Sequence, residues 1–559
     1  MSEYLKLRKS NCRNCYKCIR SCPVKSIRFD DHQAHIISDE CILCGHCFVA
    51  CPQNAKEIRS DLELAKSLLQ GAAPVIASIA PSFVANYEGT TIRSMERALK
   101  KLGFSGVEET AVGATIVKKQ YEAMVNAGGA DVILSSCCHT VNLMIQKYYP
   151  KALPYLAHVL SPMQAHGQDI RRRIPDAKTI FIGPCISKKA EADAYPGTMD
   201  CVLTFEELSV WLEQEGVELE QDIEQASGDT RARLFPVAGG ILRTMTARNP
   251  DYAYLAVDGM DNCMQALEDI LSGKITKCFI EMSACAGSCV GGPAMNKSRR
   301  LPVRDYLSVD RYAGEGDFHV AAYGQGELLK KLPSMVRNPP YVSESALRDT
   351  LRAMGKTKPE DELNCGSCGY NTCRDKAVAV ILGKATLGMC LPFLKEKAES
   401  FSDNIIRNTP NAIIVLNENL EVQQANAAAC SFFRLSGPGD VVGQPVVRLL
   451  DPAPFFTALE SGRNSYDKRA YLADYRRYVD QTIIYDRSYN ILIGILRDVT
   501  EEAEQQEEKE RLARTTVEIT DRVIEKQMRT VQEIASLLGE TTAETKVALT
   551  KLKESLRNE

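Results

Sequence analysis

Histidine is scarce in this chain. Its 559 residues include seven histidines, and none follows His319. The C-terminal part therefore lacks the imidazole that ligates an ordinary haem and the histidine that a histidine kinase phosphorylates. No ATP-binding region follows either. We therefore expect neither a histidine-ligated haem sensor nor a histidine kinase.

Long apolar runs are also missing. No stretch of about 18 apolar residues, the length that suggests a membrane-spanning helix, occurs in the chain. The N-terminal segment MSEYLKLRKS lacks the apolar core of a secretory signal. A net charge of −4 gives no reason to expect nucleic acid or an anionic membrane as the main partner. We expect a cytoplasmic protein that binds neither.

Cysteine, by contrast, is abundant. The chain has 21 cysteines, and without an export signal these indicate metal ligands rather than disulfides. A chain of 559 residues is too long for one hydrophobic core. We therefore expect a multidomain α+β and α/β protein organised around metal sites.

Residues 1–58 contain two tandem runs with the spacing C-x2-C-x2-C-x3-C-P. This is the bacterial ferredoxin spacing, in which the fourth cysteine of each run ligates the other 4Fe–4S cluster. A zinc site is the competing interpretation, but two tandem copies that both end in Cys-Pro fit it poorly. The expected ligands of cluster one are Cys12, Cys15, Cys18 and Cys51, and those of cluster two are Cys22, Cys41, Cys44 and Cys47.

Residues 59–355 alternate apolar, β-rich runs with amphipathic helical patterns. Strands are predicted at Pro74–Ala80, Asp131–Leu134 and Lys178–Ile182, and helices at Ile92–Leu102 and Ala114–Ala127. This alternation predicts an α/β domain whose loops at the strand ends hold a ligand.

Three cysteine loops fall in this domain, at 135–138, 183–189 and 280–292. By itself the pair Cys285 and Cys289 in the third loop could form a disulfide, half of a metal site or two buried thiols. Together, in order and spacing, SSCC, GPCISKK and IEMSACAGSCVGG resemble the three H-cluster loops of FeFe-hydrogenases. The family patterns are TSCCP, PCxSKK and a glutamate-led CxxxC followed by glycines.

The resemblance implies an H-cluster, a 4Fe–4S cubane joined through one cysteine to a diiron unit with CO, cyanide and a bridging dithiolate amine. It implies Cys138, Cys185, Cys285 and Cys289 as ligands, with Cys289 as the bridge. Cys137 matches the family's proton-relay cysteine. A thiol suits that role because its unperturbed pKa of about 8.5 lets it exchange protons without being permanently charged.

Other residues acquire roles only through the resemblance. Lys188 and Ser82 match positions that meet the two cyanides; the alternatives are a solvated surface lysine and an ordinary turn hydroxyl. The family's relay also uses two glutamates outside the loops. Only Glu122 lies near a candidate position, and Glu281 remains from the third loop.

Several departures from the family pattern bear on turnover. Gly183 and Ser283 stand where active members usually carry methionine, His139 replaces the proline after the double cysteine, and Pro293 replaces a common glycine. We therefore expect H2 to bind but to be oxidised slowly.

Residues 356–399 contain a third cysteine set with spacings x2, x4 and x16, formed by Cys365, Cys368, Cys373 and Cys390. It resembles a small 4Fe–4S domain with a helix between the third and fourth ligands. A structural zinc site is the alternative. A third cluster here would link the active-site domain to the C-terminal part of the chain.

Residues 400–502 resemble a PAS domain. Two strands precede a helix that begins near Asn426, and the β-rich runs Arg477–Asp486 and Tyr489–Val499 predict a hairpin. Cys430 lies on an apolar helix face and is expected to be a core thiol.

Residues 503–559 predict a helical tail. A heptad seam runs along it; its members are Val517, Ile524, Met528, Val531, Ala535 and Leu538. Gly539 predicts a stop, and Thr541 with Glu544 a capping box that starts another helix. The seam would either pair two chains or pack on its own PAS domain.

Together these features predict a sensory FeFe-hydrogenase with H2 and protons as reactants. It would form a homodimer through the PAS domain and the C-terminal helices and signal to an unspecified kinase, phosphatase or regulator. One alternative is a metabolic hydrogenase that exchanges electrons with a ferredoxin-type partner. The other is a non-catalytic iron–sulfur assembly scaffold, for which retention of Cys137 and Lys188 has no evident reason.

Overall fold

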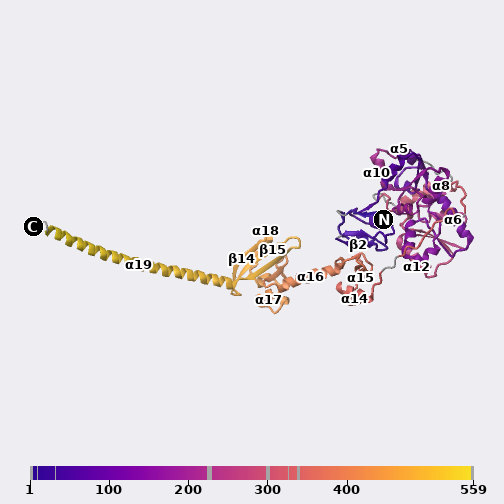
Figure 1. The fold of residues 1–559 in the computed structure, drawn as a ribbon. Coiled ribbons are helices and arrows are strands. Elements are labelled where there is room, and N and C mark those ends of the chain that lie inside the picture. Colours follow the sequence, from indigo (N-terminus) through magenta and orange to yellow (C-terminus); the bar gives the residue numbers. More distant parts are fainter. Residues whose placement is uncertain are drawn as a thin grey trace. The chain divides into compact units, whose positions relative to one another are not determined.

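The computed structural model describes residues 4–8, 11–31, 33–222, 230–296, 302–324, 326–336 and 340–555 (Figure 1). The chain divides into two compact units, Met1–Leu394 and Lys395–Glu559. The first unit holds all the predicted cluster ligands. Among the described residues, no helix combines the length and apolar character needed to span a bilayer.

The N-terminal cysteine runs form a small domain with internal symmetry. Strand β1 (Leu5–Leu7) pairs antiparallel with β4 (Lys56–Ile58), and β2 (Ile27–Asp30) pairs antiparallel with β3 (Gln33–Ile36). Each run contains one short helix, α1 (Lys17–Arg20) or α2 (His46–Val49). The two copies seen in the sequence are thus two copies in the fold.

Two parallel sheets form the core of the following α/β domain. One has the order β6-β5-β8-β9 and the other β10-β11-β7, so the predicted strands and the α/β class are confirmed. The strands are β5 (Val75–Ile79), β6 (Gly106–Glu109), β7 (Val132–Leu134), β8 (Lys178–Gly183), β9 (Cys201–Thr204), β10 (Ala253–Asp258) and β11 (Cys278–Ser283).

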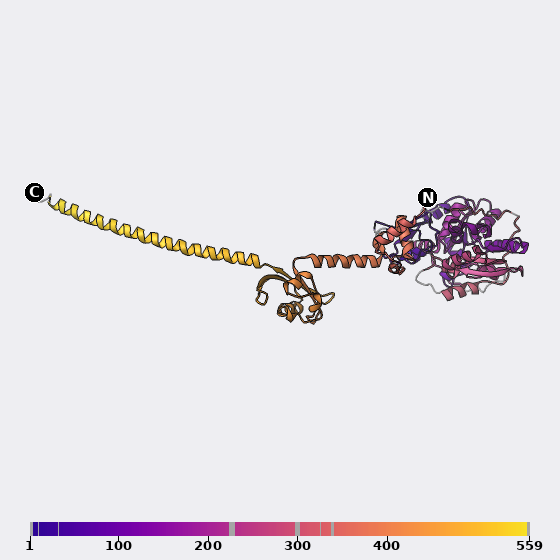
Figure 2. The ribbon, with the colours of Figure 1, turned by 90° about the horizontal axis from the view of Figure 1, so that it is seen from below.

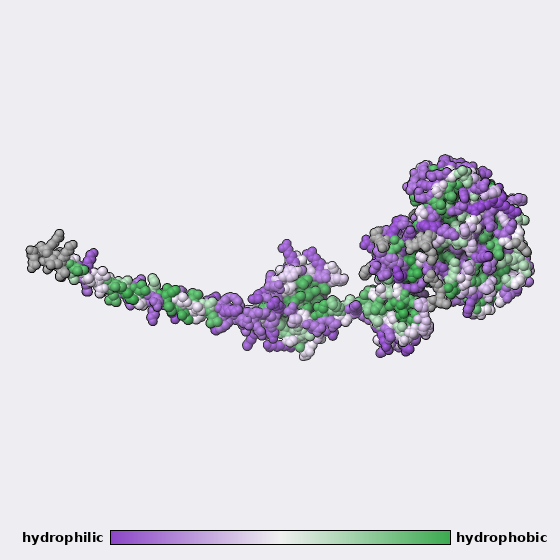
Figure 3. Space-filling model, in the orientation of Figure 1, coloured by the Kyte–Doolittle hydropathy of each residue, from purple (hydrophilic) through white to green (hydrophobic). Residues whose placement is uncertain are grey.

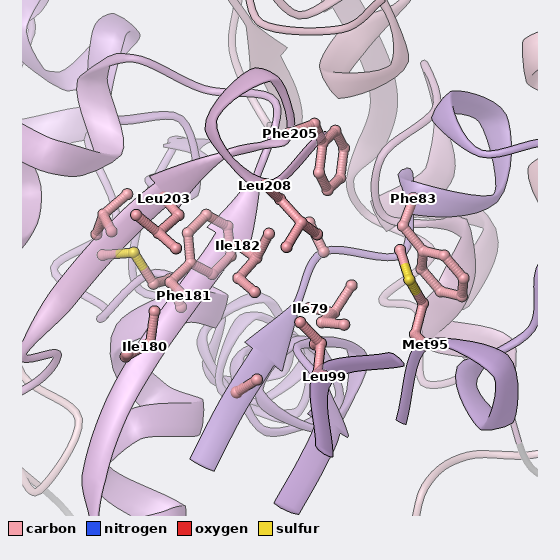
Figure 4. Packing of buried hydrophobic residues seen from close by; sticks show 14 of the residues in the cluster. Ile79, Phe83, Met95, Leu99, Ile180, Phe181, Ile182, Leu203, Phe205 and Leu208 are labelled. Atoms are coloured by element: carbon pink, nitrogen blue, oxygen red, sulfur yellow. The ribbon is translucent and has the colours of Figure 1, made fainter. Parts of the chain in front are cut away.

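Helices pack around these sheets, as parallel sheets require because both of their faces are apolar. They are α3 (Leu62–Leu69), α4 (Phe83–Asn86), α5 (Ile92–Lys101), α6 (Ala111–Ala127), α7 (His139–Tyr148), α8 (Pro162–Arg173), α9 (Ser187–Ala194), α10 (Phe205–Gln214), α11 (Gly240–Thr244), α12 (Met260–Leu271) and α13 (Pro302–Tyr312). Figure 4 shows Ile182, Leu203 and Leu208 packed in one fully buried cluster. Burial of each such side chain contributes about 1.5–3 kcal/mol to the stability of the fold. This packing fixes the strand ends that carry the cysteine loops.

The three cysteine loops follow the carboxyl ends of three strands. The first follows β7, the second follows β8 and the third follows β11. Parallel strands present these ends at one edge of a sheet, where ligands usually bind. Since β8 belongs to one sheet and β7 and β11 to the other, loops from both sheets meet at one site.

The third cysteine set lies in a small helical region. It contains α14 (Glu344–Ala353) and α15 (Cys373–Ile381), so the predicted helix between the third and fourth ligands is present. This region packs on the N-terminal domain: Tyr370 and Met389 share a core with Ile19. Figure 1 shows α15 beside β2. The sequence predicted it only as a link between the active-site domain and the C-terminal part of the chain.

The second unit contains a five-stranded antiparallel sheet with the order β13-β12-β16-β15-β14. The strands are β12 (Ala412–Leu416), β13 (Val422–Ala425), β14 (Ser465–Leu472), β15 (Arg477–Asp486) and β16 (Ile491–Asp498), with helices α17 (Ala427–Phe432) and α18 (Ala453–Ser461). The predicted hairpin is β15–β16. Asn426 caps α17 by accepting a hydrogen bond from the Ala429 amide at 2.8 Å, and Cys430 is buried in the core, as predicted.

Two long helices flank this sheet in the sequence. Helix α16 (Leu391–Asn408) runs through the predicted domain boundary at residue 399. Helix α19 (Thr500–Ser555) is continuous (Figure 2), so the predicted stop at Gly539 is wrong. A glycine inside a helix costs only about 1 kcal/mol, and the Thr541 hydroxyl donates to the Leu537 carbonyl at 2.8 Å instead of starting a new helix.

The heptad seam is exposed along α19. Val517, Ile524 and Leu538 each leave more than half of their surface accessible, at 59%, 53% and 61%, and Figure 3 shows hydrophobic residues at intervals along this helix. Near the start of the helix, Ala503 is buried, and Tyr478 of the sheet donates to Glu507 at 2.9 Å. The alternative that the seam packs on its own PAS domain is therefore wrong for these three residues.

Candidate active site

A cavity of about 110 Å³ lies where the three cysteine loops meet. All three predicted loops contribute to its wall, through Cys137, Cys185 and Cys289 among others. The remaining lining is mostly apolar and includes Ala114 and Phe235. Apolar walls lower the local dielectric constant, so each polar group on them interacts more strongly than it would in open solvent.

The four predicted H-cluster ligands come together at this cavity. Cys138, Cys185 and Cys289 line it. Cys285 lines a second cavity, which it shares with Cys44, and its pKa is raised by burial and by the neighbouring thiols of Cys185, Cys138 and Cys289. Burial raises the pKa of Cys289 to about 12, and the neighbouring thiols of Cys185 and Cys138 act in the same direction. Four crowded thiols suit a cationic iron–sulfur group, because bound metal stabilises their deprotonated form.

Cys137 lies beside the ligand set and has a partner that the sequence did not suggest. Its Sγ is 3.1 Å from the hydroxyl of Tyr121, a fully buried residue of α6 that also accepts a hydrogen bond from the Ser136 amide at 2.9 Å. Burial raises the pKa of Cys137 to about 12. The thiol is therefore protonated at neutral pH when no metal is bound.

Lys188 lines the cavity and takes part in a buried ion network. Its Nζ donates to the Cys137 carbonyl at 3.1 Å and to Glu191 at 2.5 Å. Glu191 is fully buried, pairs also with Lys330 and accepts a hydrogen bond from the Ser161 hydroxyl at 2.9 Å. The alternative of a solvated Lys188 is wrong. Glu191 and Lys330 were missed, although Glu191 follows Lys188 by one helical turn.

Ser82 supplies a test of whether the cavity suits a polar ligand. It lines the cavity with no exposed surface, and its Oγ has no hydrogen-bond partner among the described residues. An unsatisfied buried hydroxyl costs about 1–3 kcal/mol. A bound group with acceptor atoms would remove that cost, so the orphaned hydroxyl fits the predicted contact to cyanide.

The two predicted glutamates lie in different surroundings. Glu281 lines the cavity and accepts a hydrogen bond from the Leu242 amide at 3.1 Å, while burial raises its pKa to about 7. Glu122 is not among the described residues that line the cavity. It accepts hydrogen bonds from the amides of Thr246 and Ala247 at 2.6 and 3.1 Å. The helical turn that points Tyr121 toward Cys137 directs Glu122 away from it.

The departures from the family pattern also have structural settings. A Cβ at Gly183 would lie 2.6 Å from the Phe181 ring, so a methionine there would require that ring to shift. His139 is buried 3.8 Å from Glu191, and burial lowers its pKa to about 3. Pro293 packs against Gly45 of the N-terminal domain: a Cβ on Gly45 would lie 2.4 Å from it.

The predicted ferredoxin ligands group as their spacing implies. Cys12, Cys15, Cys18 and Cys51 line one cavity. In the second set, burial raises the pKa of Cys47, and the neighbouring thiols of Cys41 and Cys22 raise it further. The pKa of Cys44 is raised in the same way, by burial and by the thiols of Cys22, Cys47 and Cys41. Each group thus combines three cysteines of one run with the fourth of the other.

The third cysteine set surrounds a cavity of its own. This cavity is lined by Cys365, Cys368, Cys373 and Cys390. Two buried lysines, Lys356 and Lys376, line it as well.

Comparisons with known proteins agree with this division of the chain. Residues 73–293 match the family described as iron only hydrogenase large subunit, C-terminal domain. Residues 4–52 match a 4Fe-4S dicluster domain, residues 361–392 a putative Fe-S cluster family, and residues 400–499 the PAS fold. The matches favour iron–sulfur clusters over zinc at both additional cysteine regions.

Individual relatives are distant. The periplasmic Fe hydrogenase large subunit of Nitratidesulfovibrio vulgaris is 27% identical over 382 residues, which cover 56% of this chain and 91% of that protein. Cytosolic iron-sulfur assembly component 3 of Rattus norvegicus is 22% identical over 355 residues, 49% of this chain and 75% of the relative. A solved variant of the Chlamydomonas reinhardtii FeFe-hydrogenase is 18% identical with a TM-score of 0.36, covering 45% of this chain and 88% of its own.

The family match spans the three loops whose cysteines meet at the cavity, and the other matches coincide with the remaining cysteine sets and the antiparallel sheet. Residues 73–293 are therefore an iron-only hydrogenase large-subunit domain, which this chain joins to a 4Fe–4S dicluster domain and a PAS domain.

Proposed function

We propose that the chain is a sensory FeFe-hydrogenase that binds H2, oxidises it slowly to two protons and two electrons, and passes its redox state through iron–sulfur clusters to the PAS domain. The observation that carries the proposal is the set of polar groups on the cavity wall. Cys137, Lys188 and the orphaned Ser82 face a mostly apolar space beside the four ligand cysteines. A cubane alone would need none of these three residues.

Each polar residue has a defined task in this proposal. When bound, the diiron unit of the H-cluster supplies the metal chemistry for H2. Ser82 Oγ and Lys188 Nζ orient that unit by donating to its acceptor atoms, and the ion pair with Glu191 holds Lys188 in place. The Cys137 thiol exchanges a proton at Sγ, and Tyr121 holds that sulfur at 3.1 Å.

The proposed output rests on the second unit. The exposed apolar seam of α19 has heptad spacing, the pattern of a two-stranded coiled coil, and a homodimer would bury it. In this proposal the redox state alters the dimer, and a downstream kinase, phosphatase or regulator would recognise the altered dimer. A ferredoxin-type electron partner belongs to the metabolic alternative, which gives the PAS domain no sensory task.

A second candidate follows from the relatives. The chain resembles cytosolic iron-sulfur assembly component 3 of Rattus norvegicus at 22% identity, which favours a scaffold that lacks the diiron unit. The cavity argues against this candidate, because Ser82 would keep an unsatisfied buried hydroxyl.

Infrared spectroscopy of the anaerobically reconstituted protein separates these candidates. After addition of a synthetic diiron cofactor, the hydrogenase predicts CO and cyanide bands that shift under H2. The Ser82→Ala variant should move the cyanide bands, and a matched change at Ser78, a buried serine bonded at 2.8 Å to Thr110, should not. No bands, with iron confined to cubanes, would favour the scaffold. A high specific activity at saturating H2 would favour the metabolic enzyme.

A further inference from the structure

The region of the third cysteine set docks on the N-terminal domain through polar contacts as well as packing. Lys25 Nζ donates to the Gly369 carbonyl at 2.9 Å, and the Phe29 amide donates to the Lys384 carbonyl at 2.9 Å. Lys384 also pairs with Glu40 at 2.5 Å. These contacts fix the third cysteine site against the ferredoxin clusters.

The contacts single out one of the two ferredoxin sites. Lys25 lies in the electrostatic range of both Cys22 and Cys368, and Tyr370 lies in the range of the same two thiols. Cys22 belongs to the expected ligands of cluster two. A member of that same set, Cys44, lines a cavity with Cys285 of the active-site loops. The cluster-two site is thus next to both the active site and the third site.

The third site is unusually favourable for negative charge. Lys376 is 1% exposed, lines the cavity and donates to the Thr386 carbonyl at 2.6 Å. Lys356 is 6% exposed and lines the same cavity. Neither forms an ion pair with a carboxylate within the described ranges. A buried cation without an adjacent anion is costly, so a negatively charged group in the cavity would stabilise Lys376, and would stabilise Lys356 beyond its longer-range attraction to Asp361.

Two helices add to this field. Helix α15 begins at the ligand Cys373, and α16 begins directly after the ligand Cys390. The N-terminus of a helix carries a partial positive charge. One cluster site thus has two buried ammonium groups on its wall and two helix N-termini at its ligands, of which the first turn of α15 also carries Asp375. Reduction potential follows net charge and burial, so this arrangement favours the reduced cluster.

We propose that the third cluster is an electron trap, filled through cluster two and held in the reduced form by Lys356 and Lys376. The inference rests on the proposed function for its source of electrons. H2 gives two protons and two electrons; one electron passes from reduced cluster two, which is thereby oxidised, to the third cluster, which is reduced. The second electron stays in the ferredoxin clusters. The trapped charge then lies at the first turn of α16, the helix that leads into the PAS domain.

The test uses the full chain reconstituted with iron and sulfide but without the diiron unit, so that it does not depend on H2. Electron paramagnetic resonance monitors the clusters during a redox titration with electrochemical mediators. The Cys368→Ala variant identifies the third cluster by the signal it alters. We expect the third cluster to be reduced first, and to broaden the signal of cluster two when both are reduced.

Lys376→Met should make reduction of the third cluster at least tenfold less favourable, which is a shift of about 59 mV for a one-electron couple. Lys376→Arg should retain the wild-type midpoint, and Lys358→Met, at an exposed lysine of the same region, should leave it unchanged. If Lys376→Met loses the cluster, the same measurement is made on Lys356→Met. Reduction of the third cluster after cluster two, or a midpoint unmoved by the methionine variant, would overturn the proposal. A protein whose clusters titrate as expected but that does not oxidise H2 after the diiron cofactor is added would contradict the proposed function instead.

Discussion

The thiol of Cys137, on the wall of the active-site cavity, and the hydroxyl of the buried Tyr121 lie 3.1 Å apart. Tyr121 is itself anchored by the Ser136 amide, which donates to its oxygen at 2.9 Å. The tyrosine therefore fixes the position of the sulfur. Proton exchange at Cys137 should depend on this contact.

Removing the thiol should abolish most turnover. General acid–base groups contribute about 10²–10⁴-fold to rate, so we expect Cys137→Ala to lose at least about 10²-fold in H2 oxidation. The infrared bands of the cofactor should persist, because Cys137 is not one of the four expected ligands. Full activity in Cys137→Ala would refute the assigned proton route.

Removing only the tyrosine hydroxyl should have a smaller effect on the same step. Tyr121→Phe keeps the ring packed on Phe279 but frees the sulfur to rotate, and we expect roughly a tenfold lower turnover by the same acid–base argument. Tyr254→Phe, whose ring also packs on Phe279, serves as the matched control. Equal rates for the two phenylalanine variants would deny Tyr121 any role in positioning the thiol.

Glu281 should make turnover depend on pH near neutrality. Burial raises its pKa to about 7, and only its carboxylate form can accept a proton from the cavity. The rate should therefore rise as pH increases through about 7, and Glu281→Gln should flatten this profile. The effect of pH on stability has the opposite sign. The raised pKa of Glu281 contributes to the free energy of unfolding, and this contribution is complete below the pKa of the unfolded state, about 4.3. It is lost as pH rises through about 7. Thermal unfolding of both proteins between about pH 4 and pH 8 measures it.

Much of this site could be predicted from the sequence, because cysteine spacing is local. The grouping of Cys51 with the first run and of Cys22 with the second follows from spacing within motifs a few residues long. The meeting of Cys138, Cys185, Cys285 and Cys289 was implied by the resemblance of their three loops to those of FeFe-hydrogenases. Contacts made across the fold could not be predicted. Nothing near Tyr121 or Lys330 in the sequence indicates Cys137 or Glu191 as a partner, since each pair is joined only by tertiary packing.

The same distinction explains the error at Gly539. A glycine followed by a capping-box pattern is a local signal for a helix end, but the heptad spacing up to Leu538 belongs to a long helix that continues through the glycine. In α19 the cost of one glycine is small compared with that of breaking a 56-residue helix. The contact of the third cluster region with Lys25 was missed for a different reason, because 344 residues separate Lys25 from Gly369.

The buried network around Glu191 should be sensitive to the loss of its anion. Burial alone would raise the pKa of Glu191, but Lys188 and Lys330 outweigh it and hold that pKa far below the ordinary range. Glu191→Gln would leave two buried ammonium groups without their counterion, and removing one partner of a buried pair costs about 3–5 kcal/mol. We expect a comparable loss of unfolding free energy in urea. Glu207→Gln, which removes a partner of another buried lysine, Lys189, should cost less because Asp61 still pairs with that lysine at 3.0 Å.

The exposed seam of α19 should determine the oligomeric state. Val531 and Leu538 are separated by one heptad, and both are more than half exposed in the single chain, at 58% and 61%. In a parallel two-stranded coiled coil such positions face their counterparts in the second helix, so an aspartate at each would place like charges in an apolar interface. We expect the double variant Val531→Asp, Leu538→Asp to sediment as a monomer where the parent chain sediments as a dimer. Aspartates at Thr530 and Leu537, exposed neighbours outside the seam, should leave the dimer intact. If both variants remain dimeric, the contact between chains must lie elsewhere in the second unit, and the signal could not pass through the proposed seam.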